Sequence, residues 1–181
     1  MSFLRPSACL LLGALLLGGR AAPVAAQAHG SHDHTSPYVD LQGRDIKALS
    51  PEEVESLLAG EGMGFALPAE LNGYPGPRHV LDMAPMLGLT PDQRTAIQEI
   101  FDEMQGAARE LGAAVVEGER GLDRAFAGGT ITSDELARRL EALARDRAAL
   151  RRVHLEAHLK LRPILTEEQR QAYERARGYG G

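Results

Sequence analysis

The sequence predicts an all-α protein in which a long antiparallel helical hairpin is flanked by short helices. Two long segments carry apolar residues at alternating steps of three and four, the spacing of one helix face. Helix-start signals, in which Ser or Thr is followed three residues later by Glu or Gln, precede the helical segments. No stretch of convincing length alternates apolar and polar residues as a strand does.

Residues 1–28 have the pattern of a secretory signal peptide. A basic start is followed by the apolar run Ala8–Gly18 and by small residues around the expected cleavage sites, after Ala26 or Ala28. The apolar run is shorter than the roughly 20 residues that span a bilayer. We therefore expect export, with an uncleaved membrane anchor as the alternative. The single cysteine, Cys9, lies in this segment, so the mature protein would carry neither a thiol nor a disulfide.

Residues 29–48 begin with a polar stretch without periodicity, and we expect a disordered, histidine-containing tail there. Its histidines could bind divalent metal ions weakly at neutral pH, where imidazole is unprotonated. The alternative is a solvated linker. The histidines concerned are His29, His32 and His34.

Residues 49–88 predict short helices around a loop rich in Gly and Pro. The segment 50–59 begins Ser-Pro-Glu-Glu, a capping-box sequence with Pro at the first helical position. The stretch 61–77 is rich in Gly and Pro and is expected to be a loop with a brief helical turn near 66–71. Residues 78–87 predict another short helix. The sequence leaves open whether 61–77 is a flexible lid or a packed arm.

Residues 89–178 form the main helical domain, and its first long helix is predicted to begin at a cap on Thr90 and to reach Ala127. Such a helix would be about 55 Å long. Glycines weaken it by up to about 1 kcal/mol each, so we expect a bend near Gly118 and Gly121. Its apolar stripe consists of Ile97, Phe101, Met104, Ala108, Leu111, Val115 and Leu122.

A turn at Gly128 and Gly129 is expected to lead into the second long helix, which a second capping box at 132–135 would start. A last helix would run from the cap at Thr166 to about Arg177. Each long helix buries one face only, so short helices or a second copy of the chain must cover the rest; the heptad-like spacing favours a homodimer. The stripe of the second helix holds Leu136, Leu140, Leu143, Leu150, Ala157, Leu161 and Ile164, with Arg147 and His154 between them.

The pattern Leu-Thr-x-x-Gln occurs twice, and its physical content is a helix start. The leucine can staple onto the first turn, the threonine accepts a backbone amide and the glutamine reaches back to the amide of the cap. The two copies consist of Leu89, Thr90 and Gln93, and of Leu165, Thr166 and Gln169.

With these paired motifs, residues 78–177 resemble the Spy/CpxP family of LTxxQ-motif periplasmic proteins. The resemblance implies a periplasmic helical hairpin that dimerises into a thin, curved cradle. It also implies binding of non-native proteins without ATP, or a role in envelope stress and metal tolerance. The stretch 62–77 has no counterpart that we can place in the best-known chaperones of that family.

Arginines concentrate on the second long helix, and two leucines lie near them off the apolar stripe. Such a surface suits the loose capture of unfolded chains, because charge attracts the client and apolar contacts hold it. The alternative is a solvated face on which the arginines of this helix, Arg139 and Arg147 included, pair with nearby Glu and Asp. The candidate client-binding residues are Arg138, Arg145, Arg151, Arg152, Leu155 and Leu159.

His154 and His158 are four residues apart on the predicted helix, with Cβ atoms about 6 Å apart. Two such imidazoles could share a Zn, Ni, Co or Cu ion, with His79, Glu156, a methionine or a dimer mate completing the shell. This resembles the metal-sensing and metal-resistance branch of the family. The alternative is a packed or partly exposed histidine pair without a metal.

The remaining features exclude several classes of function. Without the leader, 18 Lys and Arg face 25 Asp and Glu, which argues against nucleic acid as a partner. The sequence contains no Gly-rich phosphate loop and no hydrolase or zinc-protease signature, so we expect neither catalysis nor a required cofactor. The leading hypothesis is a periplasmic chaperone for non-native polypeptides. The alternatives are a heavy-metal resistance or sensor protein and a regulatory partner of a membrane sensor protein.

Overall fold

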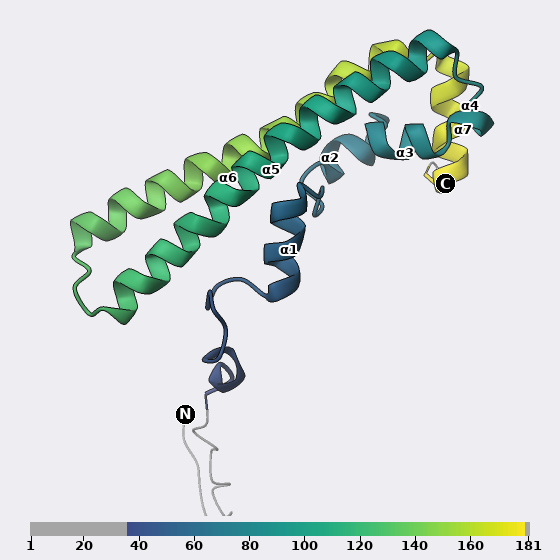
Figure 1. Cartoon of the computed structure of the whole chain (residues 1–181). Coiled ribbons are helices and arrows are strands. Elements are labelled where there is room, and N and C mark those ends of the chain that lie inside the picture. The colour runs from purple at the N-terminus through teal and green to yellow at the C-terminus, as the bar shows by residue number, and fades with distance from the viewer. Residues whose placement is uncertain (1–35, 180–181) are drawn as a thin grey trace, which may run out of the picture. The chain divides into compact units, whose positions relative to one another are not determined.

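The computed structural model describes residues 36–179, and in this range the predicted all-α fold is confirmed. Helices α5 (Pro91–Ala127) and α6 (Ser133–Leu161) pack along each other and are joined by a short turn (Figure 1). A 3-10 turn, η2 (Arg162–Ile164), leads to α7 (Glu167–Arg177). The predicted signal peptide and tail histidines lie outside the described residues.

Helix α5 runs uninterrupted through Gly118 and Gly121, where the sequence predicts a bend. A Cβ atom at Gly118 would lie 2.6 Å from Cδ2 of Leu143, and one at Gly112 would lie 2.0 Å from the carbonyl oxygen of Leu57. Gly118 therefore allows α6 to pack closely on α5, and Gly112 allows the helix that contains Leu57 to do the same.

The helix starts follow the predicted caps, with one difference. Thr90 and Thr166 form complete capping boxes with their glutamines. Thr132 accepts a hydrogen bond from the amide of Glu135, but the reciprocal bond predicted there is not formed. The carboxylate of Glu135 instead pairs with two arginines on the next turn of α6.

Four short helices precede the hairpin: α1 (Pro51–Ala59), α2 (Leu67–Glu70), α3 (Pro77–Asp82) and α4 (Ala84–Leu87). The single helix predicted over 78–87 is interrupted at Met83, because Pro85 lacks an N–H and cannot continue the hydrogen-bond ladder of α3. Helix α1 packs on α5, α2 packs on α6, and α3 contacts both.

Two buried clusters hold these layers together. In the middle of the hairpin, Leu57, Val115 and Leu150 pack with Ile46 and Leu49. At the end where α7 docks, the cluster consists of Val80, Leu87, Ile97, Leu161, Leu165 and Tyr173. Ile46 is 2% exposed, so packed structure begins before residue 48, where the sequence predicts a disordered tail. In the range 36–179, no helix is long and apolar enough to cross a membrane.

Candidate functional site

The glutamines of the two motifs hydrogen-bond to each other. Nε2 of Gln93 donates to Oε1 of Gln169 at 2.9 Å, and Nε2 of Gln169 donates to Oε1 of Gln93 at 3.0 Å. Each Oε1 also accepts from the amide of its own capping threonine at 3.0 Å. The repeated motif thus joins the N-termini of α5 and α7, which sequence reasoning, limited to one cap at a time, did not predict.

The same amides anchor neighbouring carbonyl groups. Nε2 of Gln93 donates to the carbonyl oxygen of Ile164 at 2.8 Å, and Nε2 of Gln169 donates to that of Leu87 at 3.3 Å. Leu165 is buried beside them. The six motif residues therefore form a structural joint at the end of the hairpin rather than an open binding site.

The structure divides the arginines of α6 into two groups. Arg139 pairs with Glu135 and Arg147 pairs with Glu119, both at 2.7 Å, as the solvated-face alternative predicts. The exposed Arg138 also pairs with Glu135, at 2.5 Å. All three ion pairs lie within the hairpin, and that of Arg139 is formed by its Nε.

Further along α6, the arginines are freer and leucines reach solvent. Within the described part of the chain, no ion pair involves Arg145 or Arg151, and Arg152 approaches Glu156 at 3.7 Å only. Leu155 is half-buried and Leu159 is 57% exposed. Because residues at steps of three and four share a helix face, Arg145, Arg152, Leu155 and Leu159 form one mixed stripe, with Arg151 at its edge. We call these five residues the α6 surface.

The two histidines of α6 are buried beneath residues 61–77, so this segment is a packed arm rather than a lid. His154 is 3% exposed and stacks on Phe65, with ring centroids 5.6 Å apart. Nδ1 of His158 lies 2.7 Å from the carbonyl oxygen of Tyr74. Burial, together with the charge of His158, lowers the pKa of His154. Packing alone thus accounts for much of the environment of this pair.

A buried polar cluster surrounds Glu70 on the arm. The hydroxyl of Tyr173 donates to Oε1 of Glu70, and Nδ1 of His79 lies 3.4 Å from the same oxygen. Nε of Arg177 approaches it at 3.6 Å, and Nδ1 of His158 lies 3.8 Å from Oε2. Burial, followed by the contact with Glu70, raises the pKa of Tyr173. Sequence reasoning missed this cluster, because nothing near Glu70 in the sequence indicates a partner in α7.

The side chains around Glu70 and His154 do not form a complete metal-binding site. Oε2 of Glu70 and Nε2 of His154 are buried without a hydrogen-bond partner. Across residues 36–179, no set of three or more His, Cys, Asp or Glu side chains is arranged to hold a metal ion. The pair predicted from the sequence is therefore brought together with Glu70 nearby, but not as a formed coordination shell.

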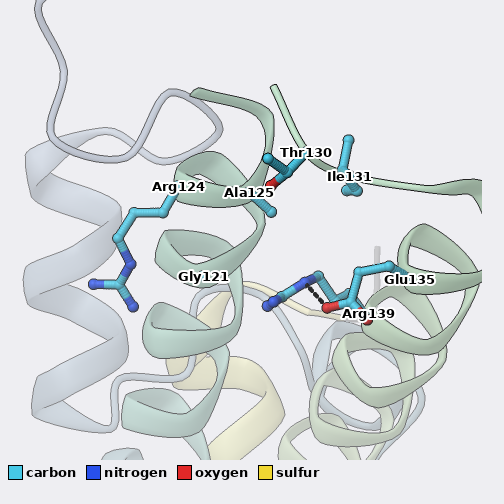
Figure 2. Close-up of a pocket in the computed structure, with 7 residues that line it drawn as sticks. All are labelled: Gly121, Arg124, Ala125, Thr130, Ile131, Glu135 and Arg139. Atoms are coloured by element: carbon cyan, nitrogen blue, oxygen red, sulfur yellow. Dashed lines mark ion pairs between the residues drawn. The ribbon is translucent and has the colours of Figure 1, made fainter. Parts of the chain in front are cut away.

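A solvent-open pocket of about 460 Å³ lies at the loop end of the hairpin. It is bounded by the last turns of α5, the connecting loop and the first turns of α6 (Figure 2). Two arginines and one glutamate stand on its wall together with small and apolar residues. The lining residues are Gly121, Arg124, Ala125, Thr130, Ile131, Glu135 and Arg139.

Comparison with known proteins places the helical part of this chain in a family. A family model described as LTXXQ motif family protein matches residues 77–177, which is more than half of the chain. No curated protein and no solved structure gives a significant match. The matched region begins at α3 and contains both copies of the motif, both long helices and α7. The chain therefore belongs to the LTXXQ motif family.

Proposed function

We propose that this protein is a periplasmic chaperone that binds non-native polypeptides without ATP. Proteins of the LTXXQ family are typically periplasmic and are not known as enzymes, which supports the location and the absence of catalysis. The leader-like residues 1–28 support export. The observation that carries the proposal is the α6 surface, where unpaired arginines lie beside exposed leucine.

Charged and apolar groups on the α6 surface act over different distances. Arg145 and Arg151 can attract acidic segments of an unfolded chain over about 8–10 Å at physiological ionic strength. Leu155 and Leu159 then offer apolar area, which stabilises contacts by about 25 cal/mol per Å² buried. Neither contact requires a fixed client shape, so binding would be broad and reversible. The core beneath α6 keeps this surface in place without a client.

The test is suppression of aggregation of reduced, unfolded α-lactalbumin by the protein without ATP. Leu159→Ser and Arg151→Gln should each raise the concentration needed for half-maximal suppression severalfold, with thermal unfolding unchanged. Leu58→Ser is the matched control, since Leu58 is 48% exposed on α1, which packs on α5. Equal loss in the control, or suppression untouched by both α6 variants, would rule out this surface as the client site.

A second candidate function is heavy-metal binding as a resistance or sensor protein. The observation that favours it is the pair of unpartnered buried atoms, Oε2 of Glu70 and Nε2 of His154, close to His158. A small movement of the arm could bring a carboxylate and two imidazoles to one Zn, Ni, Co or Cu ion.

Calorimetric titration of these four ions tests the metal proposal. The protein should carry Ala at the three tail histidines in every sample, so that weak tail binding does not obscure the result. Micromolar binding that is lost in His154→Ala and His158→Ala, but kept in the exposed α6 control Glu141→Gln, would support metal handling. Absence of binding in the parent protein would leave both histidines with a packing role.

A further inference from the structure

The pocket at the loop end of the hairpin has donors that contacts within the fold leave unused. Nε of Arg139 lies 2.7 Å from Oε1 of Glu135, the ion pair drawn in Figure 2. In the described chain, the two terminal nitrogens of Arg139 have no hydrogen-bond acceptor. The guanidinium of Arg124 is also open, because its contact with Glu117 is long, at 4.0 Å, and its side chain is 67% exposed.

Gly121 leaves room for the guanidinium group of Arg139, whereas Figure 2 shows that of Arg124 on the other side of the α5 ribbon. A Cβ atom at this position would lie 3.1 Å from Nη1 of Arg139. Any larger side chain at residue 121 would therefore push against Arg139 and fill the floor of the pocket.

The charge of the pocket favours an anion with a single negative charge. Two arginines on its wall outnumber the one carboxylate of Glu135. Hydrogen bonding to Arg138, followed by the charge of Arg139, lowers the pKa of Glu135, so this carboxylate stays ionised at neutral pH. A resident negative charge repels a dianionic phosphate more strongly than a carboxylate. Guanidinium groups also match the two oxygens of a carboxylate geometrically.

Apolar groups stand beside the donors. Ala125 and Ile131 line the pocket, and Phe126, the next residue of α5, is 56% exposed. A carboxylate that binds the terminal nitrogens of Arg139 would thus bring its neighbouring side chain against apolar surface. This combination fits an acidic residue next to an apolar residue in an unfolded chain.

We propose that this pocket is a second polypeptide-binding site, which takes carboxylates of non-native chains that lie next to apolar side chains. The proposal rests on the chaperone function above and adds a sequence preference to it. The α6 surface captures clients broadly, whereas the pocket selects acidic-apolar segments.

The test uses fluorescence anisotropy with two dye-labelled nonapeptides, one of alternating Leu and Asp and one of alternating Leu and Asn. The Asp peptide should bind at least about tenfold more tightly, as expected for charge-assisted hydrogen bonds. Arg139→Gln should remove most of this difference. Arg94→Gln is the matched control, since Arg94 is exposed on α5 and makes no ion pair in the described residues.

Gly121→Leu tests the pocket without endangering the fold. Leucine is a better helix former than glycine, so the helix itself is favoured while the floor of the pocket is filled. We expect this variant to bind the Asp peptide at least about tenfold more weakly, with a thermal midpoint that is not lowered. Unchanged affinity in Gly121→Leu, or equal affinity for the two peptides in the parent protein, would overturn the assignment. Tighter binding to phosphatidylglycerol vesicles than to the Asp peptide would overturn it in favour of lipid.

Different results would exclude the chaperone function and the pocket as a peptide site. If Leu159→Ser abolishes suppression of aggregation while Gly121→Leu leaves peptide affinity intact, the α6 surface stands and the pocket is excluded. If the parent protein binds the Asp peptide through Gly121 and Arg139 but suppresses no aggregation, the pocket stands as a peptide site and the chaperone function is excluded.

Discussion

The two ends of the α5–α6 hairpin are held together by different kinds of interaction. The motif end combines a fully buried cluster around Ile97 and Leu161 with the paired amides of Gln93 and Gln169. Toward the loop, the ion pair Arg147–Glu119 joins the middle of α6 to α5, and Phe126 and Leu140 are largely exposed. The comparison indicates that stability is concentrated where the family motifs lie, which leaves the loop end free to bind partners.

The largest expected effect comes from the same substitution at the two ends of α6. Leu161→Ala removes a side chain with 0% exposure and should lower the free energy of unfolding by about 3 kcal/mol. Leu140→Ala removes one that is 48% exposed and should cost about 0.5 kcal/mol or less. Urea denaturation measures both. Similar losses at the two positions would show that stability is spread evenly along the hairpin.

The next effect concerns the amide pair. Gln93→Ala and Gln169→Ala should each lower the free energy of unfolding by about 1–2 kcal/mol, since buried partners lose hydrogen bonds. Because the two side chains contact each other, the double variant should lose about 1 kcal/mol less than the two losses combined. Gln98→Ala, whose exposed amide donates to Asp102, is the control and should be nearly neutral. Additive losses would mean that the glutamines act only as separate caps.

The buried His154 of α6 should make the stability of the protein depend on pH. The pKa of His154 lies below its ordinary value of 6.5, so the unfolded chain binds a proton first as the pH falls. The contribution of neutral His154 to stability is therefore present above about pH 6.5 and is lost as the pH falls through the folded-state pKa. His154→Phe keeps a ring against Phe65 and removes this titration. Its urea midpoint should exceed that of the parent more at about pH 5 than at about pH 7.5; an equal difference at both would contradict the assignment.

The helices could be predicted from the sequence because their ends depend on local chemistry. The caps at Ser50, Thr90 and Thr166 act on amides three residues away, and all three boxes form as predicted. The contacts that shape the candidate sites join residues far apart in the chain. Tyr173 meets Glu70 across 103 positions, and Gln93 meets Gln169 across 76. No periodicity or spacing encodes such pairs, so the arm and its polar cluster could be found only in the structure.

The glycines of α5 also separate local helix propensity, which the sequence predicts, from tertiary packing, which it does not. Gly106 has no atom within 4 Å of an added Cβ, so Gly106→Ala should stabilise α5 by up to about 1 kcal/mol. Gly118→Ala gains the same helix propensity, but its Cβ would meet Leu143 and force that side chain to move. We expect this variant to be less stable than Gly106→Ala, as thermal unfolding would show. Equal stabilisation would mean that Leu143 adjusts without cost.

The smallest expected effect concerns the ion pair between the middle of α6 and α5. Arg147 is on the apolar stripe of α6, yet its guanidinium reaches Glu119 of α5; the side chain of Arg147 is 45% exposed and that of Glu119 is 11% exposed. Surface ion pairs contribute about 0.2–1 kcal/mol and are screened by salt. Arg147→Gln should therefore lower the free energy of unfolding by about 0.5 kcal/mol at low salt, and by less at about 0.5 M NaCl. The loss caused by Leu161→Ala should not depend on salt, because no charge is involved. If Arg147→Gln instead cost as much as a buried leucine, the hairpin would be held as firmly at its centre by this ion pair as it is at the motif end by buried leucine.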